Sequence, residues 1–149
     1  MIVTILLLVA VGYLGACLLA GFGTPAPLAR FSADGPALTR RFADPVTQVM
    51  GAYLTAAAAT PGMRVADTGT DVLLVDSRPT SRVLGGNFGM VIRVRFAADG
   101  AGCTARAEAM NKVPFAVFVR HDAAFVHAER ALRMAAKSHG LQEVLTGVS

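Results

Sequence analysis

The chain of 149 residues has no tryptophan, two cysteines and three histidines. Two cysteines cannot build a disulfide framework, and a bond between Cys17, inside a long apolar run, and Cys103 is implausible. The sequence has no CxxC pair and no HExxH motif. Thiol redox chemistry and the common zinc sites are therefore not indicated, and we expect no metal ion and no cofactor.

Charge is missing from the first 22 residues, MIVTILLLVAVGYLGACLLAGF, and the first Lys or Arg is Arg30. An apolar run of 18 or more residues is long enough to cross about 30 Å of hydrocarbon as a helix. Residues 1–22 are therefore predicted to be a transmembrane anchor, and the protein a single-pass protein of the cell membrane.

Two other readings of this segment exist. A cleaved secretory signal would have a basic start and a shorter apolar stretch. The residues LGAC at 14–17 resemble a lipobox, which would make the protein a lipoprotein anchored at Cys17 and facing outward. Because no basic residue precedes the run and the run continues past Cys17, we favour a retained anchor.

The basic residues nearest the span follow it. Arg30, Arg40 and Arg41 lie within about 20 residues of its C-terminal end, where the positive-inside rule counts them. This bias predicts that the domain after the span is cytoplasmic.

Small residues recur along the predicted anchor. Gly12, Ala16 and Ala20 are spaced by four and share one helix face, where they let another helix approach closely. We expect this face to pack against transmembrane helices of other subunits.

The chain is basic, with a formal net charge of +4. A basic domain at a bilayer favours anionic headgroups. The arginines are scattered and tryptophan is absent, so a nucleic-acid interface is not expected. Many alanines and arginines with little lysine are typical of a high-GC bacterium.

Residues 23–43, rich in proline and glycine, are predicted to be a linker. A domain over 44–149 follows, with a helix starting at Asp44-Pro45, where Asp would be the N-cap. Its other expected elements are strands over 63–68, 71–77, 89–97 and 103–110, a hairpin turn over 99–102, and a helix over 122–139 capped by Asp122 and ended by Gly140. The order α-β-β-β-β-α predicts an antiparallel meander under helices, a small two-layer α+β sandwich.

The stretch from Asp44 to Gly140 resembles the small START-like domains (SRPBCC, polyketide-cyclase-like). The resemblance is carried by the strand at 89–97 with the Asp99-Gly100 turn, by Pro114 and by the helix over 122–139. It implies a cavity for a lipid or apolar molecule between sheet and last helix, although the chain is short for the full fold.

Few residues suggest catalysis. His121, His127 and His139 do not share a helix face at metal-binding spacing, and the glycine-rich loop 85–89 precedes a strand rather than a helix. Asp67, Asp71 and Asp76 flank turns and are expected in water, as are the charged residues of the last helix, Glu129 and Arg133 among them. We therefore expect a protein that is not an enzyme.

The segment VPFAVFV at 113–119 is the most apolar stretch after the anchor. It is either a final strand covering the core or an exposed patch that docks on lipid or a partner. The docking residues would be Val113, Pro114, Phe115 and Phe118.

Two functional hypotheses follow. The first is a non-enzymatic single-span accessory protein whose α+β domain contacts a larger membrane protein assembly. The second is a membrane-tethered START-like binder of a lipid or apolar small molecule.

Overall fold

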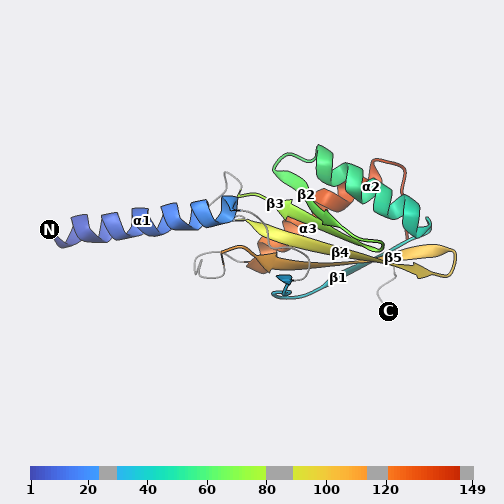
Figure 1. The fold of residues 1–149 in the computed structure, drawn as a ribbon, viewed down its shortest axis with the longest axis horizontal. Coiled ribbons are helices and arrows are strands. Elements are labelled where there is room, and N and C mark those ends of the chain that lie inside the picture. Colours follow the sequence, from blue (N-terminus) through green and yellow to red (C-terminus); the bar gives the residue numbers. More distant parts are fainter. Residues whose placement is uncertain (24–29, 80–88, 114–120, 145–149) are drawn as a thin grey trace.

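The computed structural model describes residues 1–23, 30–79, 89–113 and 121–144. Helix α1 (Ile2–Phe22) projects from one end of an α+β domain (Figure 1). In this part of the chain it is the helix long and apolar enough to cross a membrane. Its 21 residues extend about 31 Å at 1.5 Å per residue, close to the hydrocarbon thickness of a bilayer.

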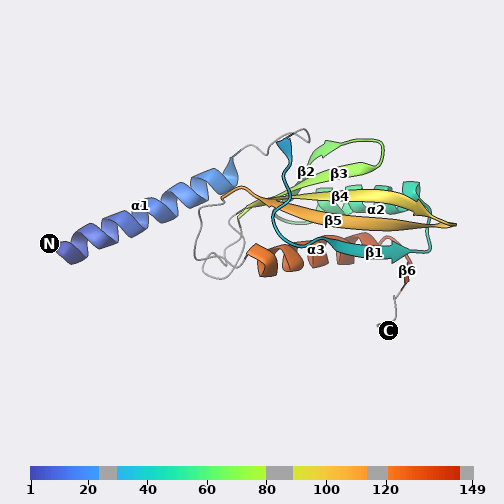
Figure 2. The same ribbon diagram turned by 90° about the horizontal axis from the view of Figure 1, so that it is seen from below.

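The domain is built on an open six-stranded antiparallel sheet in the order β2-β3-β4-β5-β1-β6. Helices α2 (Val46–Ala59) and α3 (His121–Lys137) pack on one face of this sheet (Figure 2). The predicted α+β architecture, with its antiparallel meander, is confirmed. The strands are β1 (Leu38–Phe42), β2 (Met63–Thr68), β3 (Val72–Ser77), β4 (Met90–Asp99), β5 (Gly102–Asn111) and β6 (Glu143–Val144).

The core lies between the sheet and the helices. Every second side chain of a strand points into it. The helix-facing residues of β4 are large, whereas those of β5 are small. Phe125 and Leu132 of α3 supply the bulk on the helical side of the same core. The core residues of these strands are Met90, Ile92, Val94 and Phe96 in β4, and Cys103, Ala105, Ala107 and Ala109 in β5.

Tyr53 of α2 is the aromatic centre of this core. Its ring makes edge-on contacts with Phe42 at 6.1 Å and with Phe96 at 5.5 Å between centroids. Such pairs contribute about 0.5–1.5 kcal/mol each beyond area burial. They join α2 to β1 and β4, which are not adjacent strands in the sheet.

The other face of the sheet is partly covered by the chain that leads into β1. Asp34 donates its backbone N–H to the carbonyl of Ala109 at 2.7 Å, and its carboxylate accepts the N–H of Asn111 at 3.0 Å. The Phe31 ring lies over the Arg93 guanidinium at 4.2 Å. Residues 30–37 therefore belong structurally to the domain.

This corrects the predicted linker over 23–43, because β1 lies inside it. The strand pairs with β5 from Leu38 opposite Ala107 to Phe42 opposite Cys103. Phe42 is 2% exposed. Five residues between turn-forming segments carry too little alternation to be recognised without their partner strand.

The predicted caps are also corrected. Asp44 accepts hydrogen bonds from Gln48 Nε2 and from the backbone of Gln142 instead of capping α2. Asp122 lies inside α3, which begins at His121. Gly140 follows α3 with φ +91°, as predicted for a helix end.

Candidate functional site

The last turns of α1 rest on one end of the sheet. Cys17 and Val113, 0% and 1% exposed, share a small apolar cluster. Gly89 has φ +111°, and a Cβ at this position would lie 2.7 Å from the carbonyl oxygen of Gly21. Only glycine fits that backbone approach. The helix is therefore held to the domain by a direct contact as well as by the connecting chain.

The three predicted helix-packing residues have different surroundings. Gly12 and Ala16 are exposed, and a Cβ added at Gly12 would meet nothing within 4 Å. Ala20 is half-buried and packs against the cluster of Cys17 and Val113. The small-residue face is thus open along most of α1 and covered by the protein's own domain at the C-terminal end of the helix.

The predicted docking patch is only partly described. Val113 is buried at the contact with α1 rather than exposed. Pro114, Phe115 and Phe118 lie outside the described residues. Val113 therefore serves the junction of helix and domain.

A buried ion-pair cluster, which we call the proximal cluster (Arg64, Asp76 and Lys112), lies at the same end of the sheet. Asp76 is 1% exposed, and its two oxygens accept hydrogen bonds from Arg64 Nε and Lys112 Nζ, each at 2.8 Å. The prediction that Asp76 lies in water is wrong, because β3 is an interior strand covered on both faces. Asp67 and Asp71 are exposed, as predicted.

A second group of charges, the distal network (Arg40, Glu129, Arg133, Lys137 and Glu143), lies between α3 and the strands β1 and β6. Glu143 accepts hydrogen bonds from Arg133 Nη1 at 2.7 Å and Lys137 Nζ at 3.0 Å. Oε1 of Glu129 lies 3.4 Å from Arg133 Nε and 3.8 Å from Arg40 Nε. These three atoms are buried without a hydrogen bond among the described residues.

Burial and neighbouring charges shift the pKa values of the acidic groups in and beside this network. Burial raises the pKa of Glu129, and the nearby Arg133 and Arg40 offset this only in part. Burial also raises the pKa of the Glu143 carboxyl, but hydrogen bonds from Lys137 and Arg133 outweigh it and leave that pKa below its usual value. Burial, assisted by the charge of Glu129, raises the pKa of Tyr53. The tyrosine therefore stays neutral.

Sequence reasoning missed this network by expecting Glu129 and Arg133 in water. Glu129 is 2% exposed. One signal could have found it: Phe125, Glu129, Leu132 and Ala136 are spaced by four, three and four, so the glutamate lies within the apolar stripe. A carboxylate in that stripe requires cationic partners from neighbouring elements.

The face of the sheet without helices carries ion pairs between neighbouring strands. Arg93 and Arg106 both donate to Glu108, and the hydrogen bond from Arg93 is the main cause that lowers the pKa of Glu108. A hollow of about 380 Å³ beside them is lined by Asp71, Val72, Arg93 and Arg95. Its polar groups include both signs of charge, and no arrangement of acid, base and nucleophile is evident among them.

Metal-binding groups do not converge in the part of the chain that the structure describes, which holds no set of three or more His, Cys, Asp or Glu side chains suited to an ion. His127 and His139 are exposed and His121 is half-buried. Residues 85–88 of the glycine-rich loop lie outside the described residues. In the described chain, the buried carboxylates Asp76 and Glu129 lie beside cationic side chains.

No protein-family model matches the chain, and comparison with curated proteins finds no match. The resemblance to START-like domains therefore stays a prediction. The function has to be argued from the geometry of the described residues.

Proposed function

We propose that this chain is a non-enzymatic, single-span membrane accessory protein. In this proposal α1 packs against transmembrane helices of a larger assembly, and the α+β domain contacts the parts of that assembly outside the membrane. The observation that carries the proposal is that the domain covers one part of α1 and leaves the other part exposed. Its last turns are held by the domain, whereas the small residues Gly12 and Ala16 stay exposed.

Exposed small residues matter inside a bilayer because lipid supplies no hydrophobic drive for helices to associate. Association then depends on close backbone packing, which Gly and Ala allow. With Ala20 occupied by the domain, Gly12 and Ala16 are the members of the face left for another helix. A neighbouring helix that packs on Gly12 and Ala16 would contact the part of α1 that the domain leaves uncovered.

The non-enzymatic part of the proposal is supported by how the buried charges are used. Asp76 is hydrogen-bonded to two cations, and Glu129 and Glu143 are surrounded by cations of the distal network. These pairs tie together β2, β3, α3 and β6. Groups committed to such pairs are poorly placed to exchange protons with a substrate.

The alternative, a START-like binder of a lipid or apolar molecule, requires space between sheet and helices. In the described residues that space is filled by Tyr53, Phe125, Leu132 and the helix-facing residues of β4 and β5. We therefore rank this function second.

The orientation in the membrane also stays part of the proposal. We place the domain on the cytoplasmic side, following Arg30, Arg40 and Arg41. Burial of Cys17 against Val113 supports a retained anchor over a lipoprotein acylated at Cys17.

Co-purification from native membranes in mild detergent tests the accessory role. We expect partner proteins to be recovered in stoichiometric amounts with the wild-type chain, and several-fold less with Gly12→Leu or Ala16→Leu. The matched control is Ala10→Leu, an equally exposed small residue of α1 about 200° around the helix from Gly12.

Equal recovery with all three variants would contradict the helix-packing role. A chain that elutes alone with bound lipid would instead favour the START-like alternative.

A further inference from the structure

Five chain segments meet at one end of the sheet: the last turn of α1, the start of β2, the end of β3, the start of β4 and the end of β5. Gly89 contacts Gly21 and accepts a hydrogen bond from the N–H of Lys112 at 3.1 Å. Met90 pairs with Ser77 and with Asn111, which places the end of β3, the start of β4 and the end of β5 together. Ser77 also pairs with Met63 at the start of β2.

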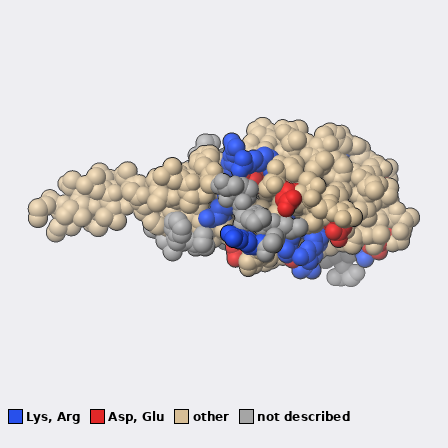
Figure 3. Space-filling model, in the orientation of Figure 1, with Lys and Arg blue, Asp and Glu red and all other residues tan. Residues whose placement is uncertain are grey.

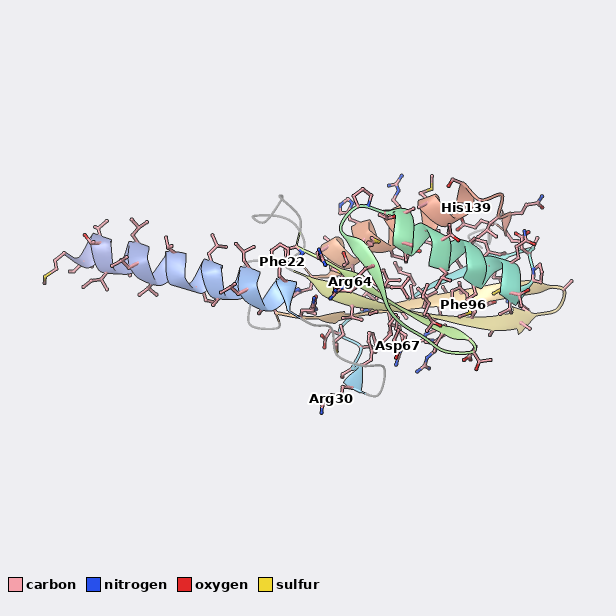
Figure 4. All side chains as sticks on the ribbon, turned by 45° about the horizontal axis from the view of Figure 1, so that its top comes forward. Phe22, Arg30, Arg64, Asp67, Phe96 and His139 are labelled. Carbon is pink, nitrogen blue, oxygen red and sulfur yellow. The ribbon has the colours of Figure 1, made fainter. Side chains whose placement is uncertain are left out.

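Basic side chains cluster at this end. Arg64 pairs with Asp76 but keeps 44% of its side chain exposed. Arg78 is exposed and donates its backbone N–H to the carbonyl of Gly62 at 2.8 Å, next to the start of β2. Arg30 is exposed in the chain that returns from α1. Lys and Arg gather where the domain meets α1 (Figure 3), and in Figure 4 Arg64 lies on the domain at the α1 end while Arg30 lies apart from it, below the sheet.

Among the described residues at this end, the basic side chains Arg30, Arg64, Arg78 and Lys112 outnumber the acidic ones, Asp34, Asp76 and Asp122. Asp76 is 1% exposed and its oxygens are occupied by Arg64 and Lys112. Asp34 and Asp122 are exposed, Asp34 accepting the backbone N–H of Asn111 and Asp122 lying beside Gly35. At the opposite end of the sheet, exposed aspartates lie at two turns, Asp71 before β3 and Asp99 at the β4–β5 hairpin, where Asp99 pairs with Arg41.

The domain also reaches along the last part of the span. Cys17 is fully buried by the domain. It lies five residues before Phe22, a distance of about 7.5 Å along the helix axis. If α1 fills the hydrocarbon layer, the contact of Gly89 with Gly21 lies at the boundary between acyl chains and headgroups, and Val113 at Cys17 reaches into the acyl layer.

We infer that Arg30, Arg64 and Arg78 form a surface that binds the phosphates of anionic lipid headgroups around α1. This inference rests on the proposed membrane insertion of α1. Guanidinium groups bind phosphate through paired N–H donors. Each basic residue near an anionic surface adds about a factor of five in affinity. The surface would fix the height and tilt of the domain on the bilayer.

The test uses the full chain reconstituted into phosphatidylcholine vesicles with or without phosphatidylglycerol. Spin-labelled forms of each lipid report, by electron paramagnetic resonance, the fraction held at the protein. We expect a several-fold preference for phosphatidylglycerol that falls at high salt because of screening. In the triple variant Arg30→Gln, Arg64→Gln, Arg78→Gln the preference should approach one, while Lys112 still pairs with Asp76.

The matched control is Arg41→Gln, Arg106→Gln, Arg130→Gln, which removes the same net charge from exposed positions away from α1. It should keep the preference. Equal retention of both lipids by the wild-type chain, or equal losses in the two triple variants, would overturn the inference while leaving membrane insertion intact. A chain that does not float with vesicles of either composition would overturn both the inference and the proposed span.

Discussion

The protein buries carboxylates on both faces of its sheet, and the two sites are built differently. In the proximal cluster each oxygen of Asp76 accepts one short hydrogen bond from a cation. In the distal network Oε1 of Glu129 has two arginines nearby but no hydrogen bond among the described residues. A buried carboxylate loses its hydration, and a nearby cation offsets this cost less well without a hydrogen bond than with one.

The largest difference should appear when each carboxylate is removed. Asp76→Ala leaves Lys112, whose side chain is 5% exposed, without its partner. Breaking a buried pair in this way costs about 3–5 kcal/mol. Urea unfolding of the full chain in detergent, followed by circular dichroism, measures this loss. Asp71→Ala removes an exposed aspartate just before the other end of the same strand and should cost well under 1 kcal/mol. Similar losses in the two variants would contradict the buried-pair account.

Glu129→Gln should have a smaller effect, a loss of about 1 kcal/mol or less. The amide keeps the shape and removes a poorly compensated charge, and Arg133 keeps its hydrogen bond to Glu143. The same unfolding measurement applies. Arg41→Gln, in the exposed pair with Asp99, is the reference for a weak surface interaction. A loss as large as that of Asp76→Ala would mean that the two sites are equivalent after all.

The smallest expected effect is in how the stability of the fold depends on pH. Burial raises the folded-state pKa of Glu129 above its ordinary value of 4.5, so the folded state binds the proton more tightly than the unfolded state. Its contribution to stability is therefore most favourable below pH 4.5 and is lost as pH rises through the folded pKa. Glu108 is the opposite case, because its lowered pKa gives stability above pH 4.5 that is lost as pH falls.

Unfolding free energies between pH 3 and 7 test this sign. As pH increases, the unfolding free energy of the wild type should include a decline above pH 4.5 that Glu129→Gln removes. It should also include a rise below pH 4.5 that Glu108→Gln removes. Identical pH profiles for the two variants would rule out the assigned directions.

The parts of the fold that could be predicted are those with local patterns. The alternation of β4, the two-residue turn after Asp99 and the apolar stripe of α3 each depend on neighbouring residues. The α+β class follows from these elements. The open small-residue face of α1 at Gly12 and Ala16 is likewise a local pattern, although what binds there stays a proposal.

The parts that were missed depend on distant partners. Asp76 follows an apolar run and Glu129 lies within an apolar stripe, but the cations that accompany them in the interior, Lys112 and Arg40, come from other elements. The contact of Gly89 with Gly21 was not foreseen for the same reason. Sequence patterns report which side chains avoid water, and give little information on which charges meet inside.

Strand β1 has a further consequence for the order of folding. It is synthesised before every other strand, yet it pairs with β5 from Leu38 opposite Ala107 onward, and with the late strand β6. Closing so long a loop is entropically unfavourable and slow relative to the meander, whose strands pair with their neighbours in the chain. The segment that follows α1 therefore stays unpaired until β5 and β6 have been synthesised. Completion of the sheet is a late event in the folding of the domain.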